Sequence, residues 1–340
     1  MKGILRTVGH SYDAGLLIVG LLVTTLLVGC RPASDSTVRL QLNWFPDAQH
    51  GGYYAADVHN CFDEEGLSNV QILKGGPGTP VIPKLLMGQV DFAIANADQV
   101  LMARAQERTD VVALFAPLQN SPRCIMVHES SGVTSLAELK DVTLAMGEGK
   151  GFAEFLKSQV PLENVRVVPY SGTVAKFLVD ENYAQQAYVF TEPLIARHRG
   201  GDPRALMVSE LGFNPYTSVL LTRKDLLDSD PKLVGKVVRA VRRGWQRYLA
   251  DAAPTNKRIR AENPELDAEL LDQAANLVRE LCLPDGMSSE SVGMMTAVRW
   301  QTLASQLQAL GLATAETVEG AFSLNFLDSP VRAGREPNGT

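Results

Sequence analysis

The feature that most constrains the fold is a repeated alternation of strand-like and helix-like segments, which begins at Val38. Residues 38–44 alternate apolar and polar side chains with a period of two, as a half-buried strand does. Residues 90–96 form a continuous apolar run typical of a buried strand, and a helical pattern follows at 97–108. This order predicts a mostly parallel sheet with helices on its faces.

The alternation runs through two successive series and then stops. The second series starts with the strand-like RCIMVHESS at 123–131, and its helices are expected at 135–141, 151–160 and 173–180. From about Ser229, three long helical patterns follow near 231–250, 265–281 and 288–310, with no strand between them. Two α/β units followed by a helical third predict a two-lobed α/β architecture.

The first 29 residues are predicted to be a signal peptide rather than part of the fold. Residues 14–29 carry no charge and are too short to span a bilayer comfortably. They end in LVGC, which resembles a bacterial lipobox, so that cleavage would leave Cys30 to take a lipid. We therefore expect an extracytoplasmic chain that is anchored to a bacterial membrane through Cys30, with a tether at 30–37 and a loose tail at 329–340. The alternative, a single membrane-spanning anchor, is disfavoured by Asp13 and by the length.

Several classes of function are disfavoured by composition and spacing. The net charge of −6 and the lack of a basic stripe argue against nucleic-acid binding. Cys61, Cys124 and Cys282 lie far apart, which predicts buried thiols with at most one disulfide and no zinc site. No nucleophile or cofactor motif is visible, so we expect no catalytic residue, metal or cofactor. A catalytic His50 paired with a distant carboxylate is the alternative that the sequence leaves open.

Unusual residues follow several predicted strands, at the ends where ligands bind in open α/β sheets. Trp44 follows the first strand in an aromatic loop, and the glycine-rich segment 75–79 follows the second. Asn96 and Asp98 follow the third, and Glu192 follows an apolar strand in the second series. Each feature alone would suit a turn or a helix cap, but several together favour a ligand pocket.

These segments resemble a known family. LNWFPDAQHGGYYAA, GGPG, LLMGQVDFAIANADQVLMAR, FTEP and RWQTLASQL are similar to periplasmic solute-binding proteins related to thiamine-pyrimidine-precursor binders and thiamine-pyrimidine synthases. The resemblance covers about 38–327. It implies the type II periplasmic-binding-protein fold, which has two α/β lobes joined by two crossovers and C-terminal helices. Lobe 1 would take 38–121 and 218–328, and lobe 2 would take 122–217.

The resemblance also implies a site between the lobes, whose closure an ABC permease with its ATPase would recognise. Trp44 would stack on a flat ring, Glu192 would accept from an amino group or protonated ring nitrogen, and Tyr216 would close over the ligand or support the hinge. The full set of implied ligand-binding residues is Trp44, His50, Tyr54, Gly76, Pro77, Gly78, Thr79, Asn96, Asp98, Glu192 and Tyr216.

The expected function is that of a solute-binding lipoprotein of an ABC importer for an aminopyrimidine or related heteroaromatic nutrient. Binders of sulfonates, taurine, nitrate or riboflavin are alternatives within the wider group. An arginine or lysine brought into the pocket by the fold, with Arg123 and Lys74 as candidates, would favour an anionic ligand. A pyrimidine-synthase-like enzyme using His50 is less favoured, because the cysteine-rich motif of that branch is absent. A sensor that passes closure to a membrane receptor is a further alternative.

Overall fold

The computed structural model describes residues 37–107 and 109–327. The predicted signal peptide, Cys30 with most of the tether, and the predicted tail lie outside the described residues. No helix within the described ranges is long and apolar enough to cross a membrane. In the same ranges, Cys61, Cys124 and Cys282 are buried free thiols, and no cluster of His, Cys, Asp and Glu side chains could hold a metal ion.

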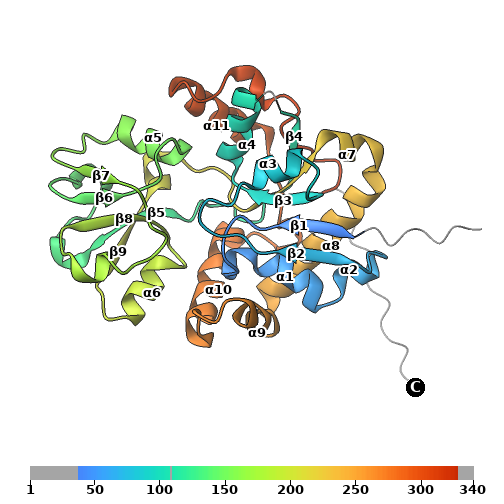
Figure 1. Cartoon of the computed structure of the whole chain (residues 1–340), viewed down its shortest axis with the longest axis horizontal. Helices are drawn as coiled ribbons and strands as arrows, with labels where there is room; N and C mark the ends of the chain where they lie inside the picture. Colours follow the sequence, from blue (N-terminus) through green and yellow to red (C-terminus); the bar gives the residue numbers. More distant parts are fainter. Residues whose placement is uncertain (1–36, 108, 328–340) are drawn as a thin grey trace, which may run out of the picture. The chain divides into compact units, whose positions relative to one another are not determined.

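The first sheet belongs to lobe 1 and has the strand order β2-β1-β3-β10-β4 (Figure 1). Its strands are β1 (Val38–Gln41), β2 (Val70–Leu73), β3 (Phe92–Ala95), β4 (Val111–Phe115) and β10 (Val219–Arg223). Strand β1 is parallel to β2 and β3, whereas β10 is antiparallel to both β3 and β4. Strand β10 returns from the other lobe and enters the interior of the sheet.

The second sheet belongs to lobe 2 and has the order β7-β6-β8-β5-β9. Its strands are β5 (Arg123–His128), β6 (Thr143–Ala145), β7 (Arg166–Val168), β8 (Tyr183–Tyr188) and β9 (Pro203–Met207). Here β5, which arrives from lobe 1, is the antiparallel strand, and it lies between β8 and β9. Both sheets therefore share one topology. They are mixed sheets rather than mostly parallel ones, because each crossover delivers one strand that runs against its neighbours.

The helices are distributed unequally between the lobes (Figure 1). Lobe 2 holds α5 (Gly151–Gln159) and α6 (Glu192–His198). The remaining helices belong to lobe 1: α1 (Gly51–Val58), α2 (Cys61–Glu64), α3 (Val81–Leu86), α4 (Ala97–Glu107), α7 (Lys224–Ser229), α8 (Pro231–Ala250), α9 (Ala253–Glu262), α10 (Ala268–Cys282) and α11 (Ala297–Ala309).

Several predicted elements differ from those observed. The helices expected at 135–141 and 173–180 are single 3₁₀ turns, Leu136–Glu138 and Phe177–Val179. In the first of these turns, Ser135 and Glu138 form a capping box around a turn that ends where Leu139 becomes extended. Between the helical patterns predicted at 231–250 and 265–281, the structure contains a further helix, α9, because proline is tolerated in a first helical turn.

Two other boundaries were also wrong. The pattern at 288–310 yields a 3₁₀ turn, Ser289–Ser291, and then α11, whose start is capped by the Thr296 hydroxyl accepting from Arg299 N. The aromatic stretch after Trp44 was interpreted as a loop, but it enters a 3₁₀ turn, Ala48–His50, and then α1. Its glycines serve helix packing. A Cβ at Gly52 would lie 2.0 Å from the Trp245 ring, and one at Gly51 would lie 2.1 Å from Tyr248.

Candidate functional site

The ends of the strands in the two sheets meet, and this contact defines the candidate site. In the first sheet, Asn96 follows β3 directly. In the second sheet, Tyr188 is the last residue of β8 and is paired in register with Arg123, the first residue of β5. Both residues therefore lie at the same end of the two strands. Asn96 Nδ2 donates to the Tyr188 hydroxyl over 3.0 Å. This hydrogen bond joins the two lobes at the ligand-binding edge expected for open α/β sheets.

Trp44 and the glycine-rich segment form one wall of the site. Trp44 is half-buried and packs edge-on against Phe45, with ring centres 5.6 Å apart. Across from them lies Gly172 of lobe 2, which has a φ of +81°. A Cβ at Gly172 would lie 3.2 Å from Pro77 and 3.5 Å from the Trp44 ring. The indole and Pro77 therefore face lobe 2 directly, and glycine is required there both for space and for conformation.

The remaining residues of the glycine-rich segment fold back on themselves. Gly75 N donates to Trp44 O over 3.1 Å, and Thr79 N donates to Gly76 O over 3.1 Å. Gly76 packs beside the Phe45 ring, and Gly78 has a φ of +76°. The Thr79 N–H is thus already used within the turn. Backbone donation to a ligand therefore remains a prediction for Gly76 and Gly78. Pro77 carries no N–H, so ligand contact by Pro77 and Thr79 through other atoms remains a prediction.

Asp98 projects from the first turn of α4 toward the start of α5 in lobe 2. Its side chain is buried, and Oδ1 has no hydrogen-bond partner among the described residues. A Cβ at Gly151 would lie only 2.8 Å from Asp98 Oδ2, so the carboxyl group occupies space that this glycine leaves open. Burial raises the pKa of Asp98, and the nearby Arg123 guanidinium partly opposes that rise.

Arg123, which the sequence offers only as a candidate for bringing positive charge to the pocket, lies beside Tyr188 at the end of β8. Its guanidinium carbon lies 4.5 Å from the centre of the Phe152 ring and 4.2 Å from that of Tyr188. The only signal in the sequence was its position at the crossover. Its placement at the ligand-binding edge depends on β5 running antiparallel to β8, which the strand pattern did not reveal.

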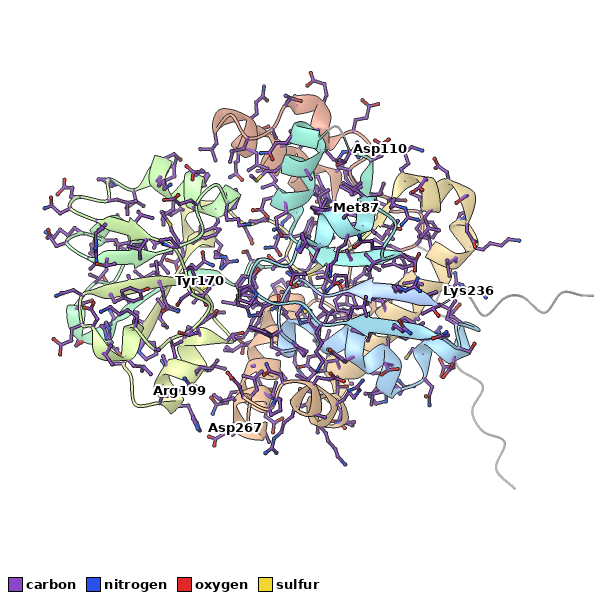
Figure 2. The ribbon with its side chains drawn as sticks, viewed as in Figure 1. Met87, Asp110, Tyr170, Arg199, Lys236 and Asp267 are labelled. Atoms are coloured by element: carbon purple, nitrogen blue, oxygen red, sulfur yellow. The ribbon has the colours of Figure 1, made fainter. Side chains whose placement is uncertain are left out.

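Glu192 begins α6 and is held by lobe 2. Glu192 Oε1 accepts from the Tyr170 hydroxyl over 2.6 Å, and Oε2 accepts from Tyr188 N over 2.8 Å. Figure 2 marks Tyr170 among the side chains of lobe 2. Burial raises the pKa of Glu192, while the hydrogen bond from Tyr170 lowers it. Each carboxylate oxygen keeps a second lone pair, so a ligand donor can still be accepted.

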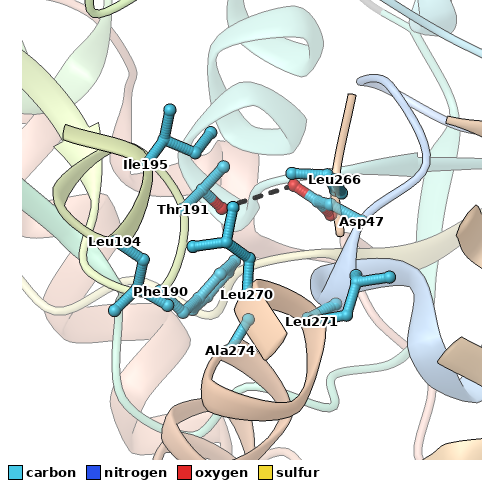
Figure 3. A pocket seen from close by; sticks show the side chains of 10 residues that line it. Asp47, Phe190, Thr191, Leu194, Ile195, Leu266, Leu270, Leu271 and Ala274 are labelled. Atoms are coloured by element: carbon cyan, nitrogen blue, oxygen red, sulfur yellow. Dashed lines mark hydrogen bonds between the residues drawn. The ribbon is translucent and has the colours of Figure 1, made fainter. Parts of the chain in front are cut away.

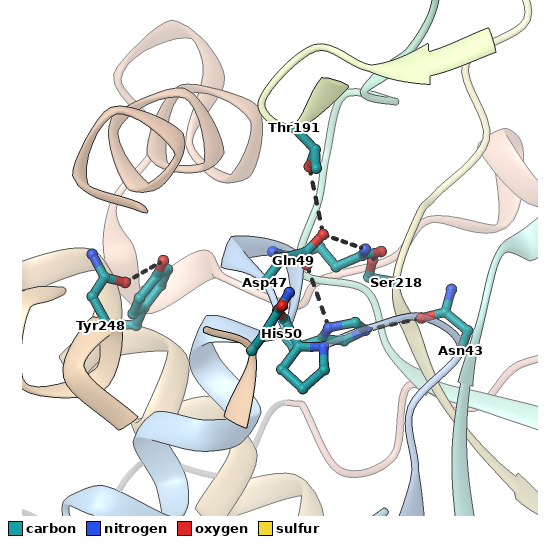
Figure 4. A network of polar contacts seen from close by, with 10 residues as sticks. Asn43, Asp47, Gln49, His50, Thr191, Ser218 and Tyr248 are labelled. Carbon is teal, nitrogen blue, oxygen red and sulfur yellow. Dashed lines mark hydrogen bonds and ion pairs between the residues drawn. The ribbon is translucent and has the colours of Figure 1, made fainter. Parts of the chain in front are cut away.

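His50 belongs to a buried polar network with Asn43 and Asp47 (Figure 4). Its Nε2 lies 2.9 Å from Asn43 Oδ1 and its Nδ1 lies 3.4 Å from Asp47 Oδ1. Asp47 in turn accepts from Gln49 Nε2 and, at 3.5 Å, from the Thr191 hydroxyl of lobe 2. The His50 ring is fully buried, and its direct contact with a ligand remains a prediction.

Tyr54 and Tyr216 pack within lobe 1. Tyr54 lies in α1 with its ring 5.8 Å from the Arg258 guanidinium, and burial raises the pKa of its hydroxyl. The Tyr216 hydroxyl accepts from Thr296 N over 3.0 Å, and Arg299 lies 4.0 Å from its ring centre. For Tyr216 this placement fits the supporting role at the hinge. Direct ligand contact by either tyrosine remains a prediction.

A second contact between the lobes lies where α6 approaches α10 (Figure 3). The start of α6 faces α10 and Asp47 across a small cavity, which leaves about 10 Å³ for the centre of a water-sized sphere. Nearby, His198 Nε2 lies 3.3 Å from Asp267 Oδ2 at the start of α10. The cavity has room for about one water molecule, so the lobes are closely apposed on this side. Its lining residues are Asp47, Ala48, Phe190, Thr191, Leu194, Ile195, Leu266, Leu270, Leu271 and Ala274.

Comparison with known proteins supplies the context for this geometry. The family model described as NMT1/THI5 like matches residues 47–254. The formylaminopyrimidine-binding protein of Halalkalibacterium halodurans is 22% identical over 312 residues, which cover 86% of this chain and 93% of the relative. The 4-amino-5-hydroxymethyl-2-methylpyrimidine phosphate synthase THI11 of Saccharomyces cerevisiae is 24% identical over 260 residues, which cover 70% of this chain and 74% of the relative.

Solved structures share the same fold. The periplasmic aliphatic sulphonate binding protein SsuA of Escherichia coli superposes with a TM-score of 0.64 at 15% identity. The match covers 84% of this chain and 91% of that protein. At this level of identity the similarity establishes the fold, which is the two-lobed α/β fold of periplasmic binding proteins. The prediction of that fold is confirmed.

Proposed function

Because the chain belongs to the NMT1/THI5-like family, we propose that it is the solute-binding protein of an ABC importer. The proposed ligand is an aminopyrimidine or a related heteroaromatic nutrient, bound between the lobes. The relative that binds formylaminopyrimidine supports this ligand class, and it is matched over most of its length. Partners would be an ABC permease and its ATPase, with membrane attachment through a lipid on Cys30.

One observation carries the proposal most directly. The indole of Trp44 faces lobe 2, and both hydrogen-bond donors and acceptors lie at the neighbouring strand ends. An aromatic face can stack on a pyrimidine ring, while Asp98, Glu192 and Asn96 can accept from amino groups. Ligand that bridges the two walls would stabilise the closed arrangement of the lobes, since binding favours whichever conformation it contacts best.

A synthase-type enzyme is a less favoured function for this chain than a solute-binding protein. His50, its candidate catalytic residue, is fully buried and held between Asn43 and Asp47. These contacts suit a group that orients the wall of a pocket. Turnover that is lost in His50→Ala while ligand binding is retained would favour the enzyme instead.

An anion-binding function is a second candidate, and Arg123 is the observation that favours it. Sequence reasoning predicted that an arginine brought to the pocket would favour a sulfonate or nitrate. Arg123 does lie at the strand ends where the sheets meet, but the carboxyl groups of Asp98 and Glu192 lie near it and offer acceptors to a ligand's donors. A ligand that offers both donors and acceptors suits this arrangement better.

The test is a binding panel on the purified mature chain. Calorimetry and thermal shift would compare formylaminopyrimidine, hydroxymethylpyrimidine, riboflavin, taurine, an alkanesulfonate and nitrate. We expect saturable binding of the pyrimidines and a rise in melting temperature with ligand concentration. Binding of sulfonate or nitrate, without any response to pyrimidines, would contradict the proposed ligand class.

Trp44→Ala should weaken pyrimidine binding by about 1–3 kcal/mol, because the stacking face is lost. Phe45→Ala is the matched control, since Phe45 is the adjacent ring but is 47% exposed. Calorimetric affinities of the two variants would be compared with that of the unaltered protein. Equal affinity for Trp44→Ala and the unaltered protein would remove Trp44 from the site.

Attachment through Cys30 is tested separately. Cells expressing the full chain would be labelled with a radioactive fatty acid, and a Cys30→Ala chain would serve as the control. Label on the unaltered chain alone would support the anchor, and label on neither would exclude it.

A further inference from the structure

We propose that Arg123 contacts the ligand directly and selects heteroaromatic solutes that carry a hydrogen-bond acceptor, such as a carbonyl, beside the ring. This inference rests on the proposed function and adds a chemical requirement to it. It concerns a residue that was absent from the set implied by the family resemblance.

The Arg123 guanidinium is held in place by aromatic rings. It lies within 4.5 Å of the centres of both the Phe152 and Tyr188 rings. Tyr188 is itself fixed, because its hydroxyl accepts from Asn96 Nδ2 and its backbone N–H donates to Glu192. A guanidinium that packs on ring faces keeps its N–H edge available for hydrogen bonding.

This N–H edge has no partner among the described residues. Across residues 37–107 and 109–327, the guanidinium of Arg123 makes no hydrogen bond and no ion pair within 4.0 Å. Two other partly buried arginines do have such partners. Arg239 pairs with Glu65, and Arg299 donates to Asn214 O. A half-buried guanidinium with unused donors is costly unless water or a ligand accepts from it.

The opposite lobe places Asp98 near Arg123. This buried carboxyl group also has an unpaired oxygen, Oδ1, among the described residues, and Arg123 is the strongest charge acting on it. The two groups therefore offer a donor edge from lobe 2 and an acceptor from lobe 1. A solute with an amino group and a neighbouring carbonyl would satisfy both and hold the lobes together.

The experiment compares two ligands and two variants. The ligands are formylaminopyrimidine and the same aminopyrimidine with a methyl group in place of the formylamino substituent. Arg123→Met keeps the apolar contacts with the rings but removes every donor. Arg166→Met is the control, because Arg166 is an exposed arginine of the same lobe.

We expect Arg123→Met to bind formylaminopyrimidine about 10- to 100-fold more weakly, since a charge-assisted hydrogen bond is lost. Its affinity for the methyl analogue should change less than about threefold, and Arg166→Met should match the unaltered protein with both ligands. Thermal unfolding would establish that Arg123→Met is folded. Should it not fold, Arg123→Lys replaces it, with the same loss of preference expected because a point charge lacks the planar donor edge.

The outcomes separate the two proposals. If the unaltered protein binds both pyrimidines and the Arg123 variant loses affinity for both equally, Arg123 does not read the acceptor and this inference is wrong, while the proposed function stands. If the unaltered protein binds neither pyrimidine, the proposed function fails and the inference fails with it.

Discussion

Asp98 combines deep burial with a charge that its surroundings only partly compensate. It has 5% of its surface exposed and lies against the start of α5. Burial is the largest influence on its pKa and raises it, whereas Arg123 and Lys150 act in the opposite direction. A group in this state lowers stability when it is ionised, and that cost has a defined pH dependence.

Asp98→Asn should stabilise the folded protein more at pH 7.5 than at pH 4. The folded protein holds the Asp98 proton more tightly than the unfolded chain, in which the pKa is near 3.9. The contribution of Asp98 to stability is therefore present below that value and is lost as pH rises through the raised folded pKa. Urea unfolding of the unaltered protein and Asp98→Asn at both pH values would measure the difference.

Asp63→Asn is the control for this experiment, because Asp63 is exposed on α2. Its substitution should give a similar change in the free energy of unfolding at both pH values. An Asp98→Asn effect that shrinks as pH rises would refute the assignment of burial as the dominant influence.

The sequence allowed a residue to be placed in the candidate site only where that residue follows a predicted strand. Asn96, Asp98 and Glu192 come directly after predicted strands, so their location near the carboxyl ends could be derived. Arg123 is the first residue of a strand, and it lies beside Tyr188 at the end of β8 because β5 runs antiparallel to β8. A single sequence carries no clear signal for the direction of a strand within its sheet.

At the scale of elements, the contact between α1 and α8 depends on missing side chains. A Cβ at Gly244 in α8 would lie 2.2 Å from Gly52 O in α1, and Tyr53 and Tyr248 pack edge-on against Trp245 beside it. The backbones therefore approach closely, and large rings fill the space around the approach. Since α1 follows the Trp44 segment, this packing fixes the position of the wall of the site.

Gly244→Ala should lower the free energy of unfolding by about 3 kcal/mol, because the new methyl group overlaps a backbone oxygen. Gly235→Ala in the same helix meets the Arg239 and Phe326 side chains at 3.2–3.3 Å, and these can shift. We expect that control to change stability by less than about 1 kcal/mol, since alanine also favours the helix. Similar denaturation midpoints for the two variants would contradict the packing argument.

Element type was predictable for long periodic segments and less so for short ones. The pattern at 231–250 gives α8 with both ends as predicted. The short pattern at 173–180 could not be separated from a single turn, because its apolar residues fit either structure. The stretch after Trp44 was misread because its glycines suggested a loop, whereas they permit close contact with a distant helix.

At the scale of the whole molecule, the described lobes touch through separate contacts that surround the site. Asn96 bonds to Tyr188, Thr191 to Asp47, and His198 pairs with Asp267. Gly172 adds a steric contact, because it lies against Pro77 and Trp44. In such a fold, the closed conformation is stabilised both by contacts of this kind and by the bound ligand.

Gly172→Ala should weaken ligand binding about tenfold or more, because the methyl group would press on Pro77 and hold the lobes apart. Gly132→Ala is the matched control. Gly132 also has a positive φ, +74°, but a Cβ there meets nothing within 4 Å. Both variants should lose about 1–2 kcal/mol of stability from backbone strain, and calorimetry should show that only Gly172→Ala loses affinity. Equal affinities would exclude a role for Gly172 in closure.

The insertion of β10 between β3 and β4 has a consequence for the order in which the chain can fold. All strands of the second sheet come from 123–207, so that sheet is complete once β9 has been synthesised. The first sheet at that moment lacks the strand that joins β3 to β4. In a nascent chain, the second sheet can therefore be complete while the first sheet is still incomplete. Strand β4 remains unpaired until β10, more than a hundred residues further along, has been synthesised.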